Sequence, residues 1–386
     1  MSSRIRLSSP HMGGGELKYV QEAIDTNWVA PMGSNISCFE QDLENYLGDG
    51  NYVTALSSGT AAIHLALILA GVERGDEVIC QSLTFAASAF PILYQGATPV
   101  FIDSEKDTWN MCPDYLEEAI KARIVKGIKP KAIIIVHVFG MPAKMDEIVS
   151  VSKKYDIPLI EDAAEALGSE YKDQKCGTLG DFGVLSFNGN KIITTSGGGA
   201  LVTKSKSVKE KTIYLATQAK DNLPYYQHSQ LGFNYRMSNV SAGIGRGQME
   251  VLDEYINKRR TNHKFYCNLF KSYEFIEVFS ECNPEIKSNY WLTCIMLKKD
   301  EPIKEVQRLF NVFKTNNIES KLMWKPMHMQ PIFRKYDFYG NIVAESMFEQ
   351  GLCLPSGSNL TKGDKERIKE VVIKFLDRCH SKHNEM

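Results

Sequence analysis

One lysine, Lys191, stands where proteins seldom place a charge. It lies in the stretch SFNGNKIITTSGGG, which begins at Ser186, between an apolar run at 182–187 and a second strand candidate at 200–203. A buried ammonium group is costly unless it is paired or neutralised. The same environment suits a lysine that forms a Schiff base, because desolvation lowers its pKa and frees the amine as a nucleophile. A surface lysine on a hairpin loop is the competing interpretation, since the chain has 45 lysine and arginine residues.

Three further groups could act together with this lysine. The small-residue turn SSGT at 57–60 precedes a helix expected at 61–70. Such a turn can bind an anion through backbone amides or can simply cap the helix, and the turn alone favours neither. Asp162 follows one expected strand, and the aromatic Phe85 follows another. A lysine for an aldehyde, a carboxylate for a pyridine nitrogen, an anion site for a phosphate and a ring for stacking are what pyridoxal phosphate requires.

Alternating strands and helices must position these groups. Strands are expected at 52–56, 77–80, 99–102, 131–138 and 157–160, with helices between them. The isoleucine- and valine-rich run at 131–138 is typical of a strand buried on both faces. The pattern predicts an α/β fold with a largely parallel sheet covered by helices. Ligands bind such sheets beyond the carboxyl ends of the strands, where the candidate groups fall.

The remainder of the chain predicts a smaller α+β unit. The expected elements are a long helix at 240–260, a strand at 290–297, a helix at 303–316 and a basic, exposed helix at 362–379. The long helix opens with small residues that permit close approach of another backbone, such as that of a second subunit. The expected division is a large domain at 1–260, which includes an N-terminal substrate segment, and a small C-terminal domain at 261–386.

Composition and charge argue against several classes of function. The net charge of −1 provides no basic field for nucleic acid or for an anionic membrane. The nine cysteines form no CxxC pair and the eight histidines show no HExxH motif, so reduced thiols and no metal site are expected. No signal peptide or bilayer-length apolar run is seen, and a cytoplasmic protein is therefore expected.

Six ordered segments resemble the DegT-type sugar aminotransferases, which are fold-type-I pyridoxal-phosphate enzymes. They are SSGTAAIHLAL from Ser57, TFAAS from Thr84, EDAAEALGS from Glu161, SFNGNKIITTSGGG from Ser186, GFNYRMSNVSAGIGRGQ from Gly232 and WKPMH from Trp324. The resemblance extends over nearly the whole chain. It implies a homodimer with shared active sites, and a transaminase, because family members that act as dehydratases have histidine in place of Lys191.

The resemblance also implies a role for each matching residue. Lys191 is the catalytic residue that bonds to the cofactor and moves protons. The other cofactor-binding residues it implies are Gly59, Thr60 and Ser186 at the phosphate, Phe85 stacked on the ring, Asp162 at the pyridine nitrogen, Glu165 near the phenolic oxygen, and Asn234 reaching the phosphate from the other subunit. Glu165 departs from the commonest pattern, which has glutamine there. A carboxylate beside a phenolate repels it unless one of the two is protonated.

The closest resemblance is to the subgroup that aminates C4 of UDP-linked 4-keto-6-deoxy-N-acetylhexosamines in bacillosamine and legionaminic acid pathways. It implies L-glutamate as the amino donor. It also implies two segments that help bind the nucleotide sugar: Asn27, Trp28, Val29 and Ala30, and Lys325, Pro326, Met327 and His328. Loop packing and helix capping are the competing interpretations of these segments. GDP- or dTDP-linked 4-keto sugars are the alternative substrates, and a catalytically silent, cofactor-binding regulator is the alternative from another class.

Overall fold

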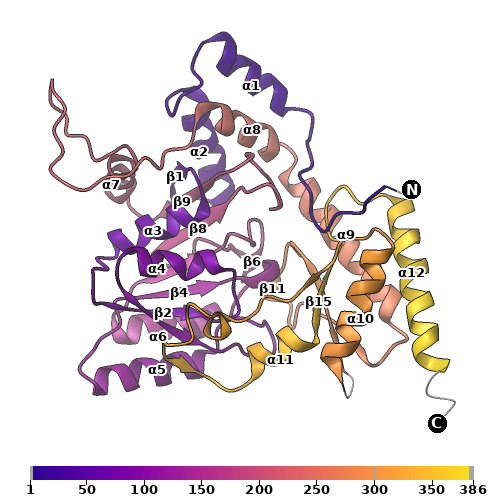
Figure 1. Cartoon of the computed structure of the whole chain (residues 1–386). Coiled ribbons are helices and arrows are strands. Elements are labelled where there is room, and N and C mark those ends of the chain that lie inside the picture. The colour runs from indigo at the N-terminus through magenta and orange to yellow at the C-terminus, as the bar shows by residue number, and fades with distance from the viewer. Residues whose placement is uncertain (1–2, 299–300, 382–386) are drawn as a thin grey trace.

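The computed structural model describes residues 3–298 and 301–381 and shows a large α/β unit beside a smaller one (Figure 1). The large unit is built on an eight-stranded sheet with the order β1-β9-β8-β5-β4-β2-β3-β14. Its strands are, in that order, Tyr52–Leu56, Gly199–Thr203, Phe182–Ser186, Leu159–Asp162, Ala132–Val136, Glu77–Gln81, Thr98–Ile102 and Phe338–Tyr339. β9 pairs antiparallel with both of its neighbours, and the other pairs are parallel. The predicted mostly parallel sheet is confirmed.

Helices cover both faces of this sheet because neighbouring residues of each strand point to opposite sides. In β4, Ile133 and Ile135 belong to one hydrophobic core, and Ala132 and Ile134 to another. The first core also includes residues of α2 (Ser34–Leu47), α5 (Pro113–Val125) and α6 (Met145–Tyr155). The second includes residues of α3 (Gly59–Leu69), α4 (Phe90–Tyr94) and α7 (Lys206–Ala216). A strand buried on both faces explains the continuous apolar run seen at 131–138.

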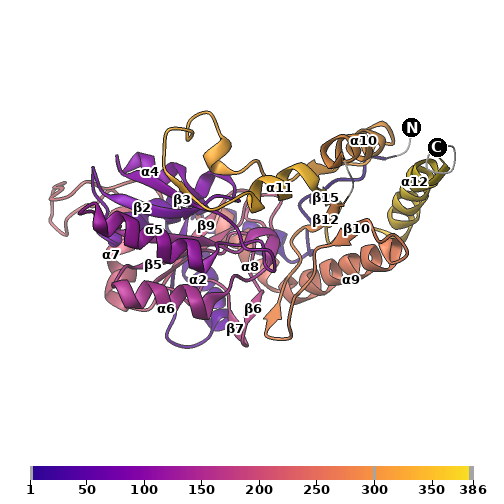
Figure 2. The same cartoon turned by 90° about the horizontal axis from the view of Figure 1, so that it is seen from below.

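The smaller unit packs helices against a four-stranded antiparallel sheet (Figure 2). Its strand order is β10 (Ile276–Val278), β12 (Thr293–Leu297), β15 (Gly351–Leu354) and β13 (Lys321–Leu322). The helices are α9 (Leu252–Phe270), α10 (Pro302–Thr315), α11 (Val343–Gln350) and α12 (Lys362–Ser381). The N-terminal segment joins this unit, since Ile5 forms a parallel bridge with Ile318. The division at residue 260, which falls inside α9, stays a prediction.

Short elements connect the two units. A small sheet joins β11 (Ile286–Lys287), β6 (Glu170–Tyr171) and β7 (Gln174–Lys175).

Short 3-10 turns lie at Ala86–Ser88, Val138–Gly140 and Met327–Met329. Within the ranges that the structure describes, no helix is long and apolar enough to cross a bilayer.

The prediction of one long helix at 240–260 is wrong, because the structure has two helices there, α8 (Asn239–Met249) and α9. Val251 between them has φ −119° and ψ 7°, outside the helical range, and packs its side chain over Gly13. The small residues of α8 do face another backbone, but it is that of α1 (Glu16–Asp25) in the same chain. A Cβ added at Gly247 would lie 2.5 Å from the amide nitrogen of Glu16.

Two further predictions in the smaller unit need correction. The strand predicted at 290–297 begins only at Thr293, because Tyr290 has a left-handed φ of 47° that a strand does not permit. The helix predicted as exposed at 362–379 is α12, and it buries an apolar stripe in the core of the smaller unit. The stripe consists of Ile368, Val371, Val372, Phe375 and Leu376. Their spacing of three and four residues places them on one face of the helix.

Candidate active site

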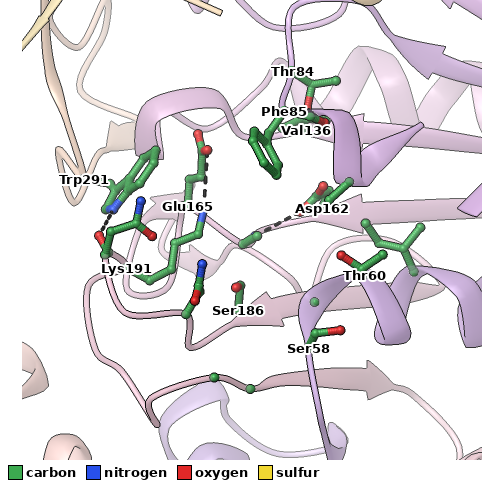
Figure 3. Close-up of a pocket in the computed structure, with 18 of the residues that line it drawn as sticks. Ser58, Thr60, Thr84, Phe85, Val136, Asp162, Glu165, Ser186, Lys191 and Trp291 are labelled. Atoms are coloured by element: carbon green, nitrogen blue, oxygen red, sulfur yellow. Dashed lines mark hydrogen bonds and ion pairs between the residues drawn. The ribbon is translucent and has the colours of Figure 1, made fainter. Parts of the chain in front are cut away.

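A cavity of about 560 Å³ opens at the carboxyl ends of the central strands (Figure 3). Its walls come from the turn after β1, the loop after β2 and the ends of β4, β5 and β8, and it is closed on one side by residues of the smaller unit. The predicted residues Gly59, Thr60, Phe85, Asp162, Glu165, Ser186 and Lys191 all line it. Parallel strands bring their carboxyl ends to one edge of the sheet, so residues far apart in sequence meet there.

Lys191 and Glu165 face one another inside this cavity. Lys191 Nζ lies 3.5 Å from Glu165 Oε1 and 4.2 Å from the ring centre of Trp291. Glu165 is only 5% exposed, and its Oε2 accepts a hydrogen bond of 2.7 Å from the amide of Phe139. Burial raises the pKa of Glu165, while Lys191 and the Phe139 amide oppose part of that rise. The site therefore favours a proton on Glu165 when the charge of Lys191 is removed.

Asp162 ends β5 with its carboxylate directed into the same cavity, on the other side of the view in Figure 3. Its Oδ2 accepts a hydrogen bond of 2.6 Å from Ser88 Oγ, and its Oδ1 accepts one of 3.2 Å from the amide of Ala164. These donors hold the carboxylate in one orientation. A fixed, buried carboxylate is suited to pair with a protonated ring nitrogen.

The turn after β1 forms a cradle of backbone amides at the start of α3. Ser58 is the N-cap, and its Oγ accepts a hydrogen bond of 3.0 Å from the amide of Ala61. The remaining first-turn amides have no partner within the helix and carry the positive end of its dipole. A Cβ added at Gly199 would lie 2.3 Å from the amide nitrogen of Gly59, so β9 must pass close beneath the turn. The capping and anion-binding interpretations are thus compatible.

Phe85 offers an aromatic face at the mouth of the cavity. Its backbone is extended, at φ −74° and ψ 147°, and its side chain is 62% exposed although it lies beside buried Ser88. An exposed ring at a cavity mouth is a suitable partner for a flat ligand.

These groups fit pyridoxal phosphate by their chemistry. The cavity supplies an amine, a fixed carboxylate opposite it, an amide cradle that glycine keeps open and an aromatic ring. Each matches one part of the cofactor: its aldehyde, its pyridine nitrogen, its phosphate and its ring.

The other predicted residues do not line the cavity of their own chain. Asn234 lies on the connection between α7 and α8, where its Oδ1 accepts a hydrogen bond of 3.2 Å from Gln218. Asn27 to Ala30 form an exposed turn after α1. In the last segment, Met327 is buried, and His328 bonds Ser82 Oγ at 2.7 Å and Glu345 Oε1 at 3.1 Å. Their roles in binding the cofactor or the substrate stay predictions.

Several residues that sequence reasoning did not single out complete the site. Trp291 packs beside Lys191 and donates a hydrogen bond of 2.7 Å to the carbonyl of Asn190. Buried Arg259 donates to the carbonyls of Trp291, at 2.6 Å, and Lys191, at 3.4 Å. Lys321 and Trp324 also line the cavity. The only available signal was Trp324, at the start of the WKPMH segment, since the others follow no motif or periodicity that points to a site.

A model of the DegT/DnrJ/EryC1/StrS aminotransferase family matches residues 10–373. The chain belongs to this family. The predictions of this family, of its fold and of an aminotransferase are confirmed.

Relatives in this family cover almost the whole chain. The Bacillus subtilis protein EpsN, named as a pyridoxal phosphate-dependent aminotransferase, is 48% identical over 97% of this chain and 96% of its own. GDP-perosamine synthase of Escherichia coli O157:H7 is 35% identical over 96% and 98%. The UDP-4-amino-4,6-dideoxy-N-acetyl-beta-L-altrosamine transaminase of Campylobacter jejuni is 31% identical over 90% and 91%.

A solved structure of the same fold is Streptococcus pneumoniae Spr1654, named as a sugar aminotransferase, in its PLP form. It has a TM-score of 0.88 and 25% identity over 97% of this chain and 99% of that one. Pyridoxal phosphate, the cofactor expected from the sequence, is borne out by these relatives. The aminotransferase is accordingly one that acts on sugars.

Proposed function

We propose that this enzyme transfers the amino group of L-glutamate to C4 of a UDP-linked 4-keto-6-deoxy-N-acetylhexosamine, UDP-2-acetamido-2,6-dideoxy-4-hexulose. The product is a UDP-4-amino sugar for glycans of the bacillosamine or legionaminic acid type. The observation that carries the proposal is that Lys191, Glu165 and Asp162 face one cavity, with Lys191 Nζ 3.5 Å from Glu165 Oε1. The transfer proceeds in two stages, with 2-oxoglutarate leaving before the keto sugar enters.

Residues of this chain would hold the cofactor at fixed points. Gly59, Thr60 and Ser186 would bind the phosphate, Phe85 would stack on the ring, and Asp162 would keep a proton on the ring nitrogen. When bound, pyridoxal phosphate supplies an aldehyde that carries the amino group and a ring that withdraws electrons from the reacting carbon.

Lys191 moves protons in both stages. Its Nζ removes a proton from Cα of L-glutamate in the first stage and delivers a proton to C4 of the sugar in the second. Trp291 and Arg259 hold the lysine in place from the side and through its backbone carbonyl. Glu165, whose pKa is raised by burial, would present a proton to the phenolic oxygen of the ring in place of a repelling charge.

A GDP-linked 4-keto-6-deoxyhexose is the second candidate substrate. It is favoured by the similarity to GDP-perosamine synthase, which at 35% identity exceeds that to the UDP-sugar transaminase at 31%. The segments PHMGGGELKYV, NWVAP and EDAAEALG favour the UDP-linked sugar. A dTDP-linked 4-keto-6-deoxy sugar is the third candidate substrate.

We also propose a cytoplasmic homodimer in which Asn234 completes the phosphate site of the partner. The connection from α7 to α8, which carries Asn234, projects away from the body of the chain (Figure 1). Large apolar side chains are exposed on it, on α1 and on the turn that follows α1: Leu17, Ile24, Trp28, Val29, Met32, Leu223, Tyr225, Tyr226 and Leu231. Exposed apolar groups on this scale are typical of surfaces that a protein partner covers.

The shared site can be tested by mixing two inactive variants, Lys191→Ala and Asn234→Ala. In a mixed dimer, one site would carry both changes and the other would be intact, so activity should return after subunit exchange. Absence of recovery, with mixed dimers verified by mass spectrometry, would place Asn234 outside the partner's site.

The substrate is tested by incubating the enzyme with L-glutamate and a panel of UDP-, GDP- and dTDP-linked 4-keto-6-deoxy sugars. We expect fastest turnover with the UDP-linked N-acetylhexosamine, and NMR of the product would establish the configuration of its C4 amine. L-glutamate alone should shift the visible spectrum of the yellow enzyme. No spectral response to L-glutamate would favour another donor or the silent regulator.

A further inference from the structure

A second cavity adjoins the catalytic cavity. It has a volume of about 300 Å³ and lies between the N-terminal segment, the end of α10 and the segment that enters β13. Lys321, on the edge strand β13, lines both cavities. The two cavities therefore meet at the side of this one residue.

The charges around the second cavity are mainly positive. Arg4, Lys314 and Lys321 line it, with Glu319 as the one acidic residue among its described lining residues. Glu319 is already engaged, since its Oε1 lies 4.0 Å from Arg4 and its Oε2 accepts a hydrogen bond of 3.2 Å from the amide of Leu7. Neither Lys314 nor Lys321 forms an ion pair with any residue at 3–298 or 301–381. Two uncompensated ammonium groups attract an anion.

The wall of the second cavity also contains a buried hydroxyl group, that of Ser320, which lies between the two lysines in the sequence. Ser320 is 6% exposed, and its Oγ has no hydrogen-bond partner in the part of the chain that the structure describes. Buried hydroxyl groups are nearly always hydrogen-bonded in native proteins. Rotation about one side-chain bond would allow this group to donate to an anion held by the lysines.

We propose that Lys314, Ser320 and Lys321 form a subsite for the diphosphate of the nucleotide sugar. The inference rests on the proposed function, because a nucleotide-linked substrate carries its diphosphate on C1, across the sugar ring from the reacting C4. With C4 beside Lys191, the diphosphate points out of the catalytic cavity. Lys314 lines only the second cavity, so a carboxylate of L-glutamate held beside Lys191 in the catalytic cavity would not account for it.

The subsite is tested with Lys314→Gln and Lys321→Gln in the cofactor-loaded enzyme. Lys264→Gln is the matched control, because Lys264 is an exposed lysine of the same unit that lines neither cavity. Dissociation constants for UDP, GDP and inorganic pyrophosphate are measured by calorimetry at two salt concentrations. Michaelis constants are measured for the keto sugar nucleotide and for L-glutamate.

We expect each Gln variant to weaken binding of the nucleoside diphosphates and of pyrophosphate by about tenfold. The KM for the nucleotide sugar should rise with it, while the KM for L-glutamate stays unchanged in Lys314→Gln, because Lys314 lines only the second cavity. Lys321→Arg should retain binding, since it keeps the charge. The wild-type affinity should fall as salt rises, and more steeply than that of the variants.

Unchanged dissociation constants in both Gln variants would overturn the subsite, and so would a rise confined to the KM for L-glutamate. Failure of the proposed function gives a different result. In that case the wild-type enzyme itself shows no turnover of keto sugar nucleotides or no spectral response to L-glutamate.

Discussion

Two groups of acids lie side by side at the end of β5, and only one of them faces the cavity. The first, the closed acid cluster, consists of Glu161 with His137 and Cys176, all of which are fully buried. The second, the cavity acids, consists of Asp162 and Glu165. Glu161 and Asp162 are neighbours in the strand, so the pleat directs their side chains to opposite faces.

The carboxylate of the closed acid cluster has all its hydrogen-bond partners within the protein. Glu161 Oε2 accepts hydrogen bonds from His137 Nε2 at 3.0 Å and from the amide of Gly177 at 2.8 Å, and Oε1 accepts from the amides of Leu179 and Gly180. Burial would lower the pKa of His137, but Cys176 and Glu161 raise it to about 10. The cluster thus contains an acid, a base and a thiol, yet its partners are all internal. The comparison teaches that a buried acid-base group becomes a site only where a cavity admits a ligand.

Lys191→Ala tests the cavity side of this comparison and should have the largest effect. Turnover should fall by about 10⁴-fold or more because both proton transfers lose their base. The variant should still bind pyridoxamine phosphate, as measured by absorbance, and remain folded. Lys204→Ala is the control: Lys204 Nζ donates to Asn51 Oδ1 at 2.7 Å and lines no part of the cavity. A near-normal rate in Lys191→Ala would contradict the assignment of Lys191 as the catalytic residue.

Glu161→Ala tests the closed acid cluster and should act on stability. Removing the carboxylate leaves His137 Nε2 and several amides buried without a partner, which should lower the free energy of unfolding by about 3–5 kcal/mol. Urea unfolding monitored by circular dichroism measures it. The fraction that stays folded should retain its turnover, and loss of turnover at unchanged stability would show that Glu161 belongs with the cavity acids.

Asp162→Asn should show the reverse pattern. The amide oxygen can still accept the hydrogen bond of Ser88, so the fold should persist, but the negative charge at the ring nitrogen is lost. We expect turnover to fall by about 10²–10³-fold, as for removal of one oriented electrostatic group. Steady-state rates and urea unfolding of the same preparation separate the two effects. A variant that unfolds as readily as Glu161→Ala would erase the distinction between the two groups.

Glu165→Gln should have the smallest effect, because neutral glutamine resembles the protonated acid. We expect turnover within about tenfold of the wild type. Burial raises the folded pKa of Glu165 above its ordinary value of 4.5. The folded state therefore binds more protons than the unfolded state between the two values, and the stability of the wild type falls as pH rises through that window.

Urea unfolding of Glu165→Gln and the wild type across that window should reveal the difference. The variant should gain stability relative to the wild type as pH rises above about 4.5 and match it below. A constant difference across pH would mean that the folded pKa of Glu165 equals its ordinary value, and a loss of stability by the variant relative to the wild type as pH rises would mean that Glu165 stays ionised in the folded protein.

Much of the large unit was predictable because its signals are local. Strand Tyr52–Leu56 was predicted with the bounds observed, since an apolar run and the turns beside it mark the strand directly. The break between α8 and α9 was not, because it depends on the packing of Val251 over Gly13, which lies far away in sequence. The buried stripe of α12 has a readable period, but the number of charged residues between its members suggested exposure.

The sequence alone predicted Lys191 and its chemistry, because a lysine between two apolar strands and beside a glycine-rich turn is a local pattern, and the six matching segments can be recognised without the fold. Tertiary structure decided the rest of the site. It turned Asp162 toward the cavity and Glu161 away from it, and it brought Trp291, Arg259 and Lys321 from the smaller unit to the lysine. Contacts between the two units produce no repeating pattern of apolar residues in the sequence. Each of these residues fits its own helix, strand or loop equally well whether or not the contact forms.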